Sequence, residues 1–472
     1  MMRMFVLVTG AALLSACAAT KPPASPGAEI PAAWYAPPLP HQGRAGELAA
    51  WWSQFNDPVL SQWIERAQAQ SPSIAAARAQ VFAARAAVAG AESAAGPQAA
   101  LVASAVRGQS SNTAPLGTGL SAGVQASWAL DLWGQSAAGT AQARAQQDAA
   151  RAGWHEARVL VAAETAQRYF GQRLCQAQLA VATSDRDSRA ATAQSSAVAE
   201  RAGLLAPAVA ALARASAAES AARTQQQAEQ CERQVKALVA LTAVPEPELH
   251  AQLAGAPGLP AHERLQSMLA VNAVPAEVIR QRPDVFRAQR ELVAASEGVG
   301  VARAALLPSL TLAGSVLRNR FTAPGGSDSF NTWSVGPLTL SLPMLGRGAL
   351  SASADAAQAR FDAAGQAYAA TLRRAVAEVE QSLVTLSGLQ QRAASTETAV
   401  VGYTQSFTAT EARHRVGLAN LNELEEARRL KLNAQSSAVA LQQERINAWI
   451  TLYVALGGGF DPLDPNAPQN TP

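Results

Sequence analysis

The stretch Arg201-Ala202-Gly203-Leu204 recurs 214 residues later as Arg415-Val416-Gly417-Leu418. Each copy follows a long segment without proline, residues 135–200 in the first case and 347–414 in the second. Glycine readily adopts the left-handed conformation that ends a helix and lets the chain reverse. At 1.5 Å per residue, the two proline-free segments predict helices of about 100 Å. The sequence therefore predicts two long helical hairpins, which turn at Gly203 and Gly417.

These hairpins belong to a larger duplicated unit. Pro72 recurs 211 residues later as Pro283, and Leu130-Asp131-Leu132-Trp133-Gly134 recurs after 212 residues as Leu342-Pro343-Met344-Leu345-Gly346. In each copy the predicted order is helix, two strands, long helix, glycine turn and helix, and such a repeat decides the whole fold. The predicted segments are a first repeat over 45–243, an equatorial connection over 244–281, a second repeat over 282–456 and a C-terminal tail over 457–472.

Alternation of apolar and small polar residues predicts four strands, at about 99–109, 119–132, 309–321 and 330–345. From Leu120 to Leu132, every even-numbered residue is apolar. One apolar and one polar face are typical of a transmembrane β-barrel, and also of a soluble sheet packed on helices. Four strands are too few to close a barrel, and lipid does not tolerate an open sheet edge. A barrel would therefore need two, three or four copies of the chain.

Several aromatic residues lie near the predicted strand ends, and they include Phe330. Aromatic rings favour the membrane surface because they combine an apolar body with a polar edge. We expect a membrane aromatic belt made of Trp128, Trp133, Phe321 and Trp333.

The N-terminus is typical of a secreted lipoprotein. Arg3 precedes an apolar run from Met4 to Leu14, which predicts a signal peptide over residues 1–16. The run ends in Leu14-Ser15-Ala16-Cys17, which resembles the bacterial lipobox and makes Cys17 the predicted lipid anchor. Ala18 follows rather than the Asp of inner-membrane retention, so we expect the outer membrane. Residues 17–44 form the tether; an ordinary signal peptide with an incidental cysteine is the alternative.

Composition argues against several other functions. The 472 residues carry a net charge of only +3, which is too weak to suggest a nucleic-acid partner. The chain has no Walker A, CxxC or HExxH motif, and its five histidines lack metal-ligand spacing. The match to GxSxG at Gly119–Gly123 opens a predicted strand, whereas a nucleophile elbow needs a strand-to-helix turn. We therefore expect no enzyme activity, no catalytic residue, no metal site and no cofactor.

These features together resemble the TolC-like outer-membrane efflux family, in its NodT-type lipoprotein branch. The resemblance covers about residues 45–460 and rests on the lipobox, the repeat, Arg282-Pro283-Asp284-Val285, and Ala304 to Leu310 around Pro308. It implies a homotrimer in which a 12-stranded outer-membrane barrel continues into a 12-helix periplasmic tunnel. Each long helix then runs beside two shorter ones, so the expected fold is mostly α with a small β part.

The resemblance also implies a function for the glycine turns. In the family, these helical tips form a periplasmic entrance that is closed at rest, which makes Arg201, Gly203, Arg415 and Gly417 candidates for the gate or for adaptor contacts. The family's usual Asp after the second glycine is Asn420 in this chain. We expect at least one of Glu423, Glu425 and Glu426 to line the lumen, where three subunits would form an acidic ring. The alternative is a solvated helix face whose glutamates, Glu426 included, pair with Arg428 and Arg429.

Two cysteines suggest a cross-link. Cys175 and Cys231 each lie 28 residues from Gly203, so an antiparallel hairpin places them at the same height. The periplasm is oxidising, which allows a disulfide if the Cα atoms come within about 7 Å. Two buried free thiols are the alternative.

The expected function is a passive exit duct in the outer membrane. As the resemblance implies, the duct would work with a periplasmic adaptor and an inner-membrane pump, and it would contact outer-membrane lipid but no nucleic acid. A type I protein secretion duct and a non-conducting periplasmic scaffold are the alternatives. The sequence does not identify the exported substrate.

Overall fold

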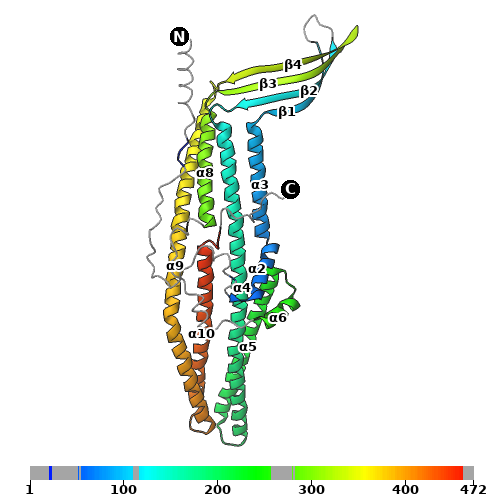
Figure 1. Cartoon of the computed structure of the whole chain (residues 1–472). Helices are drawn as coiled ribbons and strands as arrows, with labels where there is room; N and C mark the ends of the chain where they lie inside the picture. The colour runs from blue at the N-terminus through cyan, green and yellow to red at the C-terminus, as the bar shows by residue number, and fades with distance from the viewer. Residues whose placement is uncertain are drawn as a thin grey trace.

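The computed structural model describes residues 21–23, 52, 55–109, 116–256, 279 and 282–460. The molecule is elongated, with a four-stranded sheet at one end and the turns of two helical hairpins at the other (Figure 1). Cys17 and most of the predicted tether, equatorial connection and C-terminal tail lie outside the described residues.

The helices follow the duplicated order predicted from the sequence. In the first repeat they are α2 (Pro58–Gln70), α3 (Pro72–Ala95), α4 (Gln135–Arg201) and α5 (Pro207–Thr242), followed by α6 (Glu246–Gly255). In the second repeat they are α8 (Pro283–Ala304), α9 (Arg347–Arg415) and α10 (Leu421–Ala455). The long helix α4 packs against α3 and α5, and α9 packs against α8 and α10 (Figure 1). This confirms the expected arrangement of one long helix beside two shorter ones.

Short polar residues and prolines decide where the shorter helices begin. The Asp57 carboxylate accepts hydrogen bonds from the backbone of Val59 and Leu60 at the start of α2, and Ser71 caps α3 through Ile74. Pro72 follows its cap at the first helical position, where the missing N–H has no partner in any case. Ser71 and Pro72 therefore separate α2 from α3.

The main core lies near mid-length, where the chain is richest in large apolar side chains. Trp63, Tyr169, Leu238 and Trp449 bring α2, α4, α5 and α10 together, and each is almost fully buried. Trp63 donates to Gln252 over 2.6 Å, which holds α6 against this core. Because this cluster contains residues from α4 and α5 of the first repeat and from α9 and α10 of the second, it joins the two repeats.

A buried arginine joins the start of the second repeat to the end of the last helix. Arg282 donates to the Ala455 carbonyl over 2.7 Å, to Glu378 over 2.7 Å and to Asp284 over 2.8 Å. Burial opposes ionisation of Asp284, but the hydrogen bonds and charge of Arg282 outweigh it and lower the pKa of this carboxyl. The Arg282-Pro283-Asp284 stretch is thus a structural node between α8, α9 and α10.

The four strands form one antiparallel sheet in the order β1-β2-β3-β4. They are β1 (Gln98–Gly108), β2 (Gly117–Leu130), β3 (Ser309–Ala323) and β4 (Gly326–Ser341). The central pair, β2 and β3, comes from different repeats, so the sheet also joins the two halves of the chain. All four strands are present within a few residues of their predicted positions, although β4 starts four residues before the expected 330. Gly325 and Gly326 have φ of +116° and +153°, which lets the chain reverse in a tight turn.

The two faces of the sheet differ in polarity. Val124 is paired with Leu101 on β1 and with Val316 on β3, and Val316 with Trp333 on β4, so these four side chains share one face. We call this the apolar face. On the opposite, polar face, Ser104 is hydrogen-bonded to Ser121 over 2.8 Å and Ser315 to Ser334 over 3.0 Å.

The predicted aromatic belt is wrong for two of its four residues. Phe321 is paired with Gly119 and lies over Gly117 on the polar face, opposite to Trp128. Trp333 lies on the apolar face but at mid-strand, opposite Val316, because β4 begins earlier than expected. Trp128 and Trp133 lie at the helix end of the sheet, where their indole nitrogens donate to the carbonyls of Ala95 and Pro308. Phe330 also pairs on the polar face, with Asn319.

Cys175 on α4 and Cys231 on α5 form a disulfide, with Cα atoms 5.6 Å apart. The Ala-rich helices allow this short approach, which sets the register of the first hairpin. Within the described part of the chain, no helix is both long and apolar enough to cross a membrane.

Candidate functional site

The turn of each helical hairpin is built on a left-handed glycine. Gly203 has φ of +71° and Gly417 has φ of +76°. The next residue donates back across the turn in both hairpins, from Leu204 to the Ala199 carbonyl and from Leu418 to the Arg413 carbonyl, each over 2.8 Å. This pattern satisfies the last carbonyls of the helix. A β-carbon at either glycine would meet no atom within 4 Å, so the backbone angle and not lack of space calls for glycine.

Polar side chains brace the second turn more than the first. Asn420 caps α10, because its carbonyl oxygen accepts from the Glu423 backbone over 2.9 Å and its amide donates to the Glu423 carboxylate over 2.7 Å. Arg413 donates to the Leu418 carbonyl over 3.0 Å, and a ring nitrogen of His414 lies 2.9 Å from the Ala419 carbonyl. Asn420 and Glu423 therefore have a local role in ending the turn.

A group of charged side chains ties the two hairpins together above the turns, and we call it the hairpin cluster. It consists of Asp185, Arg189 and Thr192 on α4, Ser216 on α5, and Glu425 and Arg428 on α10.

Glu425 is at the centre of this hairpin cluster. It forms ion pairs with Arg189 and Arg428 and accepts a hydrogen bond from Ser216 over 3.0 Å. Arg189 also pairs with Asp185 over 2.8 Å. The Glu425 side chain is only 17% exposed, so water screens these charges weakly. Two acidic and two basic groups balance, which is how buried charges are normally tolerated.

Arg428 fixes the other side of the cluster. It donates to the Thr192 hydroxyl over 2.8 Å and lies 5.7 Å from the centre of the Phe407 ring on α9. Phe407 packs with Leu424 and Ala427 in a small apolar core next to these charges. Burial lowers the pKa of the Arg428 guanidinium, and the charge of the Glu425 carboxylate opposes that shift.

The other predicted tip residues make only local contacts among the described residues. Arg201 donates to the Ala197 carbonyl of its own helix over 3.2 Å, and Arg415 pairs with Glu411 over 2.9 Å. Glu426 pairs with Arg429 over 2.6 Å on an exposed face. Leu204, Val416 and Leu418 are exposed at the two turns.

The hairpin cluster is only partly visible in the sequence. Pairing of Glu425 with Arg428 and of Glu426 with Arg429 is the alternative that sequence analysis left open. Arg189 and Asp185 were missed, since they lie on a different helix, 236 residues or more before Glu425 and Arg428. Their spacing of four residues is the one available signal, but such pairs are common on helix surfaces.

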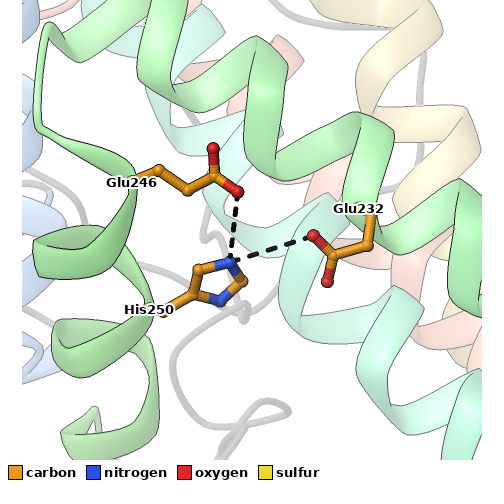
Figure 2. Close-up of side chains that lie close together, drawn as sticks. All are labelled: Glu232, Glu246 and His250. Carbon is orange, nitrogen blue, oxygen red and sulfur yellow. Dashed lines mark ion pairs between the residues drawn. The ribbon is translucent and has the colours of Figure 1, made fainter.

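A separate group of side chains that could bind a metal lies on α5 and α6, near mid-length of the molecule (Figure 1). His250 on α6 lies 3.7 Å from Glu246 and 3.8 Å from Glu232 on α5, measured between its Nε2 and their carboxylate oxygens (Figure 2). The donor set suits a divalent cation, and the ligand atoms lie within 4.8 Å of one another. However, Lys236 pairs with Glu246 and lowers the pKa of that carboxyl. Glu246 is thus already held in an ion pair by a lysine, and we assign no metal to this group.

Ser121 lies inside β2 and exchanges a hydrogen bond with Ser104, so the GxSxG match does not form a strand-to-helix turn. The described structure thus has an apolar-faced sheet at one end and, near the other end, a charged cluster that links the two helical hairpins.

The chain is similar to known outer-membrane efflux proteins. A family model described as outer membrane efflux protein matches residues 63–244 and 274–458. Nodulation protein T of Rhizobium leguminosarum bv. viciae is 27% identical over 431 residues, which cover 88% of this chain and 86% of that protein. The pyoverdine export outer membrane protein OpmQ of Pseudomonas putida is 28% identical over 469 residues, which cover 96% of both.

Solved structures share the whole fold. The outer-membrane channel OprN superposes with a TM-score of 0.82 at 26% identity, over 94% of this chain and 99% of that one. The outer membrane protein VceC from Vibrio cholerae superposes with a TM-score of 0.75 over 88% of this chain and 99% of that one. Its identity of 24% supports likeness of fold alone.

Proposed function

The chain belongs to the outer membrane efflux protein family, and on that premise we propose that it is the exit duct of a tripartite efflux system. Substrate would pass through the lumen without chemistry. An inner-membrane pump would supply the energy, and a periplasmic adaptor would connect the pump to the helical tips. Lipid on Cys17 would anchor the chain to the outer membrane.

The observation that carries this proposal is the joining of an apolar-faced sheet to helices long enough to reach far from the membrane. The helix α4 has 67 residues, or about 100 Å at 1.5 Å per residue. The outer strands β1 and β4 have no strand partner on their far sides among the described residues. Unpaired strand edges cannot face lipid, so further copies of the chain must pair with them. Three copies would give a closed sheet above a helical tunnel.

The hairpin cluster is the proposed periplasmic gate. Glu425 on α10 is held by Arg189 on α4, so it links the second hairpin to the first. With both hairpins tied together, the tips cannot spread, and the entrance stays narrow. An adaptor that contacts the exposed turn residues Leu204, Val416 and Leu418 would weaken this link from outside.

Planar-bilayer conductance tests the duct and its gate together. Glu425→Gln leaves Arg189 and Arg428 with Asp185 as their main acidic partner, and breaking a buried ion pair in this way costs on the order of 3–5 kcal/mol. We therefore expect small conductance for the wild-type protein and clearly larger conductance for the variant. Glu426→Gln is the matched control, because that glutamate makes an exposed pair on the same helix and should change nothing.

The outcomes separate the alternatives. Conductance that rises equally in both variants would mean that loss of charge near the tips matters and the hairpin cluster does not. No conductance in any variant would favour a non-conducting scaffold over a duct. A secretion duct would conduct in the same way, and only the transported substrate would distinguish it.

A further inference from the structure

The apolar face of the sheet changes character along its length. Near the helices, it carries large apolar side chains in every row, from Leu130, Leu310 and Leu340 to Leu101, Val124, Val316 and Trp333. At the other end of the strands, near the β1–β2 and β3–β4 connections, the same face carries the arginines of the sheet. Arg318 is paired with Ala122, Arg320 with Leu120, and Arg107 with Thr118, and all three are exposed.

The distance from the apolar residues at the helix end of the sheet to the arginines matches the thickness of the apolar band of a membrane. Arg320 lies ten residues beyond Leu310 on β3, which is about 33 Å along the strand at 3.3 Å per residue. Strands of membrane sheets are tilted by about 40°, so the height gained is about 25 Å, equal to the usual apolar band. Arg318 lies two residues lower, within reach of the same boundary if its long side chain extends toward water.

These arginines lack acidic partners in the described part of the chain. No ion pair joins Arg107, Arg318 or Arg320 to any described carboxylate, and Asp328 is the only acidic residue in the four strands. Asp328 is paired with Phe321, which places it on the polar face. The apolar face thus carries three positive charges and no negative charge among its described residues.

Among the described residues, the apolar face carries no aromatic side chain at the level of these arginines. Trp128 and Trp133 mark the helix end of the sheet, but Phe321 and Phe330 near the hairpin turns are on the polar face. On the apolar face the outer boundary is therefore marked by guanidinium groups together with hydroxyl and amide groups of Thr118, Asn331 and Ser329.

We propose that Arg107, Arg318 and Arg320 bind the phosphate groups of the anionic glycolipid in the outer leaflet of the outer membrane. This inference rests on the proposed function, since it needs the sheet to cross that membrane with its hairpin turns outward. A guanidinium donates two parallel hydrogen bonds to a phosphate, and few other groups in a lipid match that geometry. Arg318 and Arg320 also line one shallow pocket with Leu120 and Ala122, so an acyl chain can lie beside the phosphate.

Lipid binding to the purified full-length protein in detergent tests the proposal. The probe is diphosphoryl lipid A, and its dephosphorylated form is the comparison; both are followed by native mass spectrometry. We expect Arg318→Gln/Arg320→Gln to bind the phosphorylated probe about tenfold or more weakly than wild type, with little change for the dephosphorylated one. Arg318→Lys/Arg320→Lys should fall between them, because lysine keeps the charge but not the paired donors.

Arg223→Gln/Arg233→Gln is the matched control, since it removes the same charge from exposed sites on α5. It should bind like wild type, and millimolar inorganic phosphate should not displace the lipid. Equal binding of both lipids by wild type, or unchanged binding by the Arg318/Arg320 variant, would overturn the inference. In either case, conductance through the Glu425→Gln variant would leave the proposed duct standing, whereas no conductance in that variant or in wild type would refute the duct itself.

Discussion

At the scale of single residues, the structure separates groups that join elements within the frame from groups that link the two helical hairpins. Arg282 is a frame residue: it is buried, and it joins the start of α8 to the end of α10 through the Ala455 carbonyl. Glu425 is a linking residue, because its partners lie on two different hairpins. Both rely on opposite charges in a poorly hydrated place, but only the second belongs to the proposed gate.

Asp284→Asn should destabilise the protein by about 2 kcal/mol at pH 7, because Arg282 loses one of its two acidic partners. The pKa of Asp284 is lowered in the folded state, so its contribution is present above its ordinary value of 3.8 and is lost as pH falls through the folded pKa. The gap in thermal unfolding midpoint between variant and wild type should therefore shrink below about pH 4.

Asp187→Asn is the control for this prediction, since its pair with Arg186 is exposed. It should leave the midpoint nearly unchanged at both pH values. A gap for Asp284→Asn that stays the same at pH 7 and pH 3 would show that the carboxylate charge is not what stabilises the node.

At the scale of elements, the helices and their caps were predictable, and the faces of the strands were predictable only where the alternation is unbroken. Pro72 and Ser71 give a local signal for the start of α3, because capping acts over three residues. The aromatic belt failed at Phe321 because side chains alternate between faces along a strand, and Phe321 is odd-numbered whereas Leu312 and Val316 of the apolar face are even-numbered. On β4 the pairing shifts between Leu338 and Val335, and this irregularity brings Trp333 to the apolar face.

The disulfide between Cys175 and Cys231 should stabilise the first hairpin by limiting its unfolded chain. With a sequence separation of 56 residues, chain entropy gives about 4 kcal/mol. Non-reducing peptide mapping should yield one cross-linked peptide pair, and reduction should lower the unfolding midpoint. The Cys175→Ser/Cys231→Ser variant should unfold at the reduced midpoint with or without reductant; two free, alkylatable thiols in the native protein would refute the bond.

At the scale of the whole molecule, the sheet of a single chain has unpaired edges and an uncovered apolar face. The sheet has open edges at β1 and β4, and the exposed apolar residues of one face, such as Trp333 at 78%, have no cover within the described chain. Membership of the outer membrane efflux family confirms the resemblance found in the sequence. Trimer formation and lipid anchoring remain predictions.

Native mass spectrometry of the detergent-purified protein should give complexes of three subunits, because three four-stranded sheets can close without leaving an edge in lipid. The subunit mass should equal that of residues 17–472 plus acyl chains. Cys17→Ser should lose the acyl mass but keep the threefold complex, since the sheet and not the anchor joins the copies. Complexes of two or four subunits, or an unmodified Cys17, would contradict these expectations.

The sequence alone determined the order and length of the elements, because proline, glycine and capping residues act locally and because each half repeats the other. It also indicated the cysteine pair, whose equal distance from Gly203 is preserved in a straight hairpin. Only the tertiary structure decided which charges meet and which strand residues face together. Arg189 reaches Glu425 across 236 residues, and Arg318 shares a face with Trp333 through strand pairing. Such contacts depend on how helices and strands are placed side by side, and no local pattern in the chain encodes that placement.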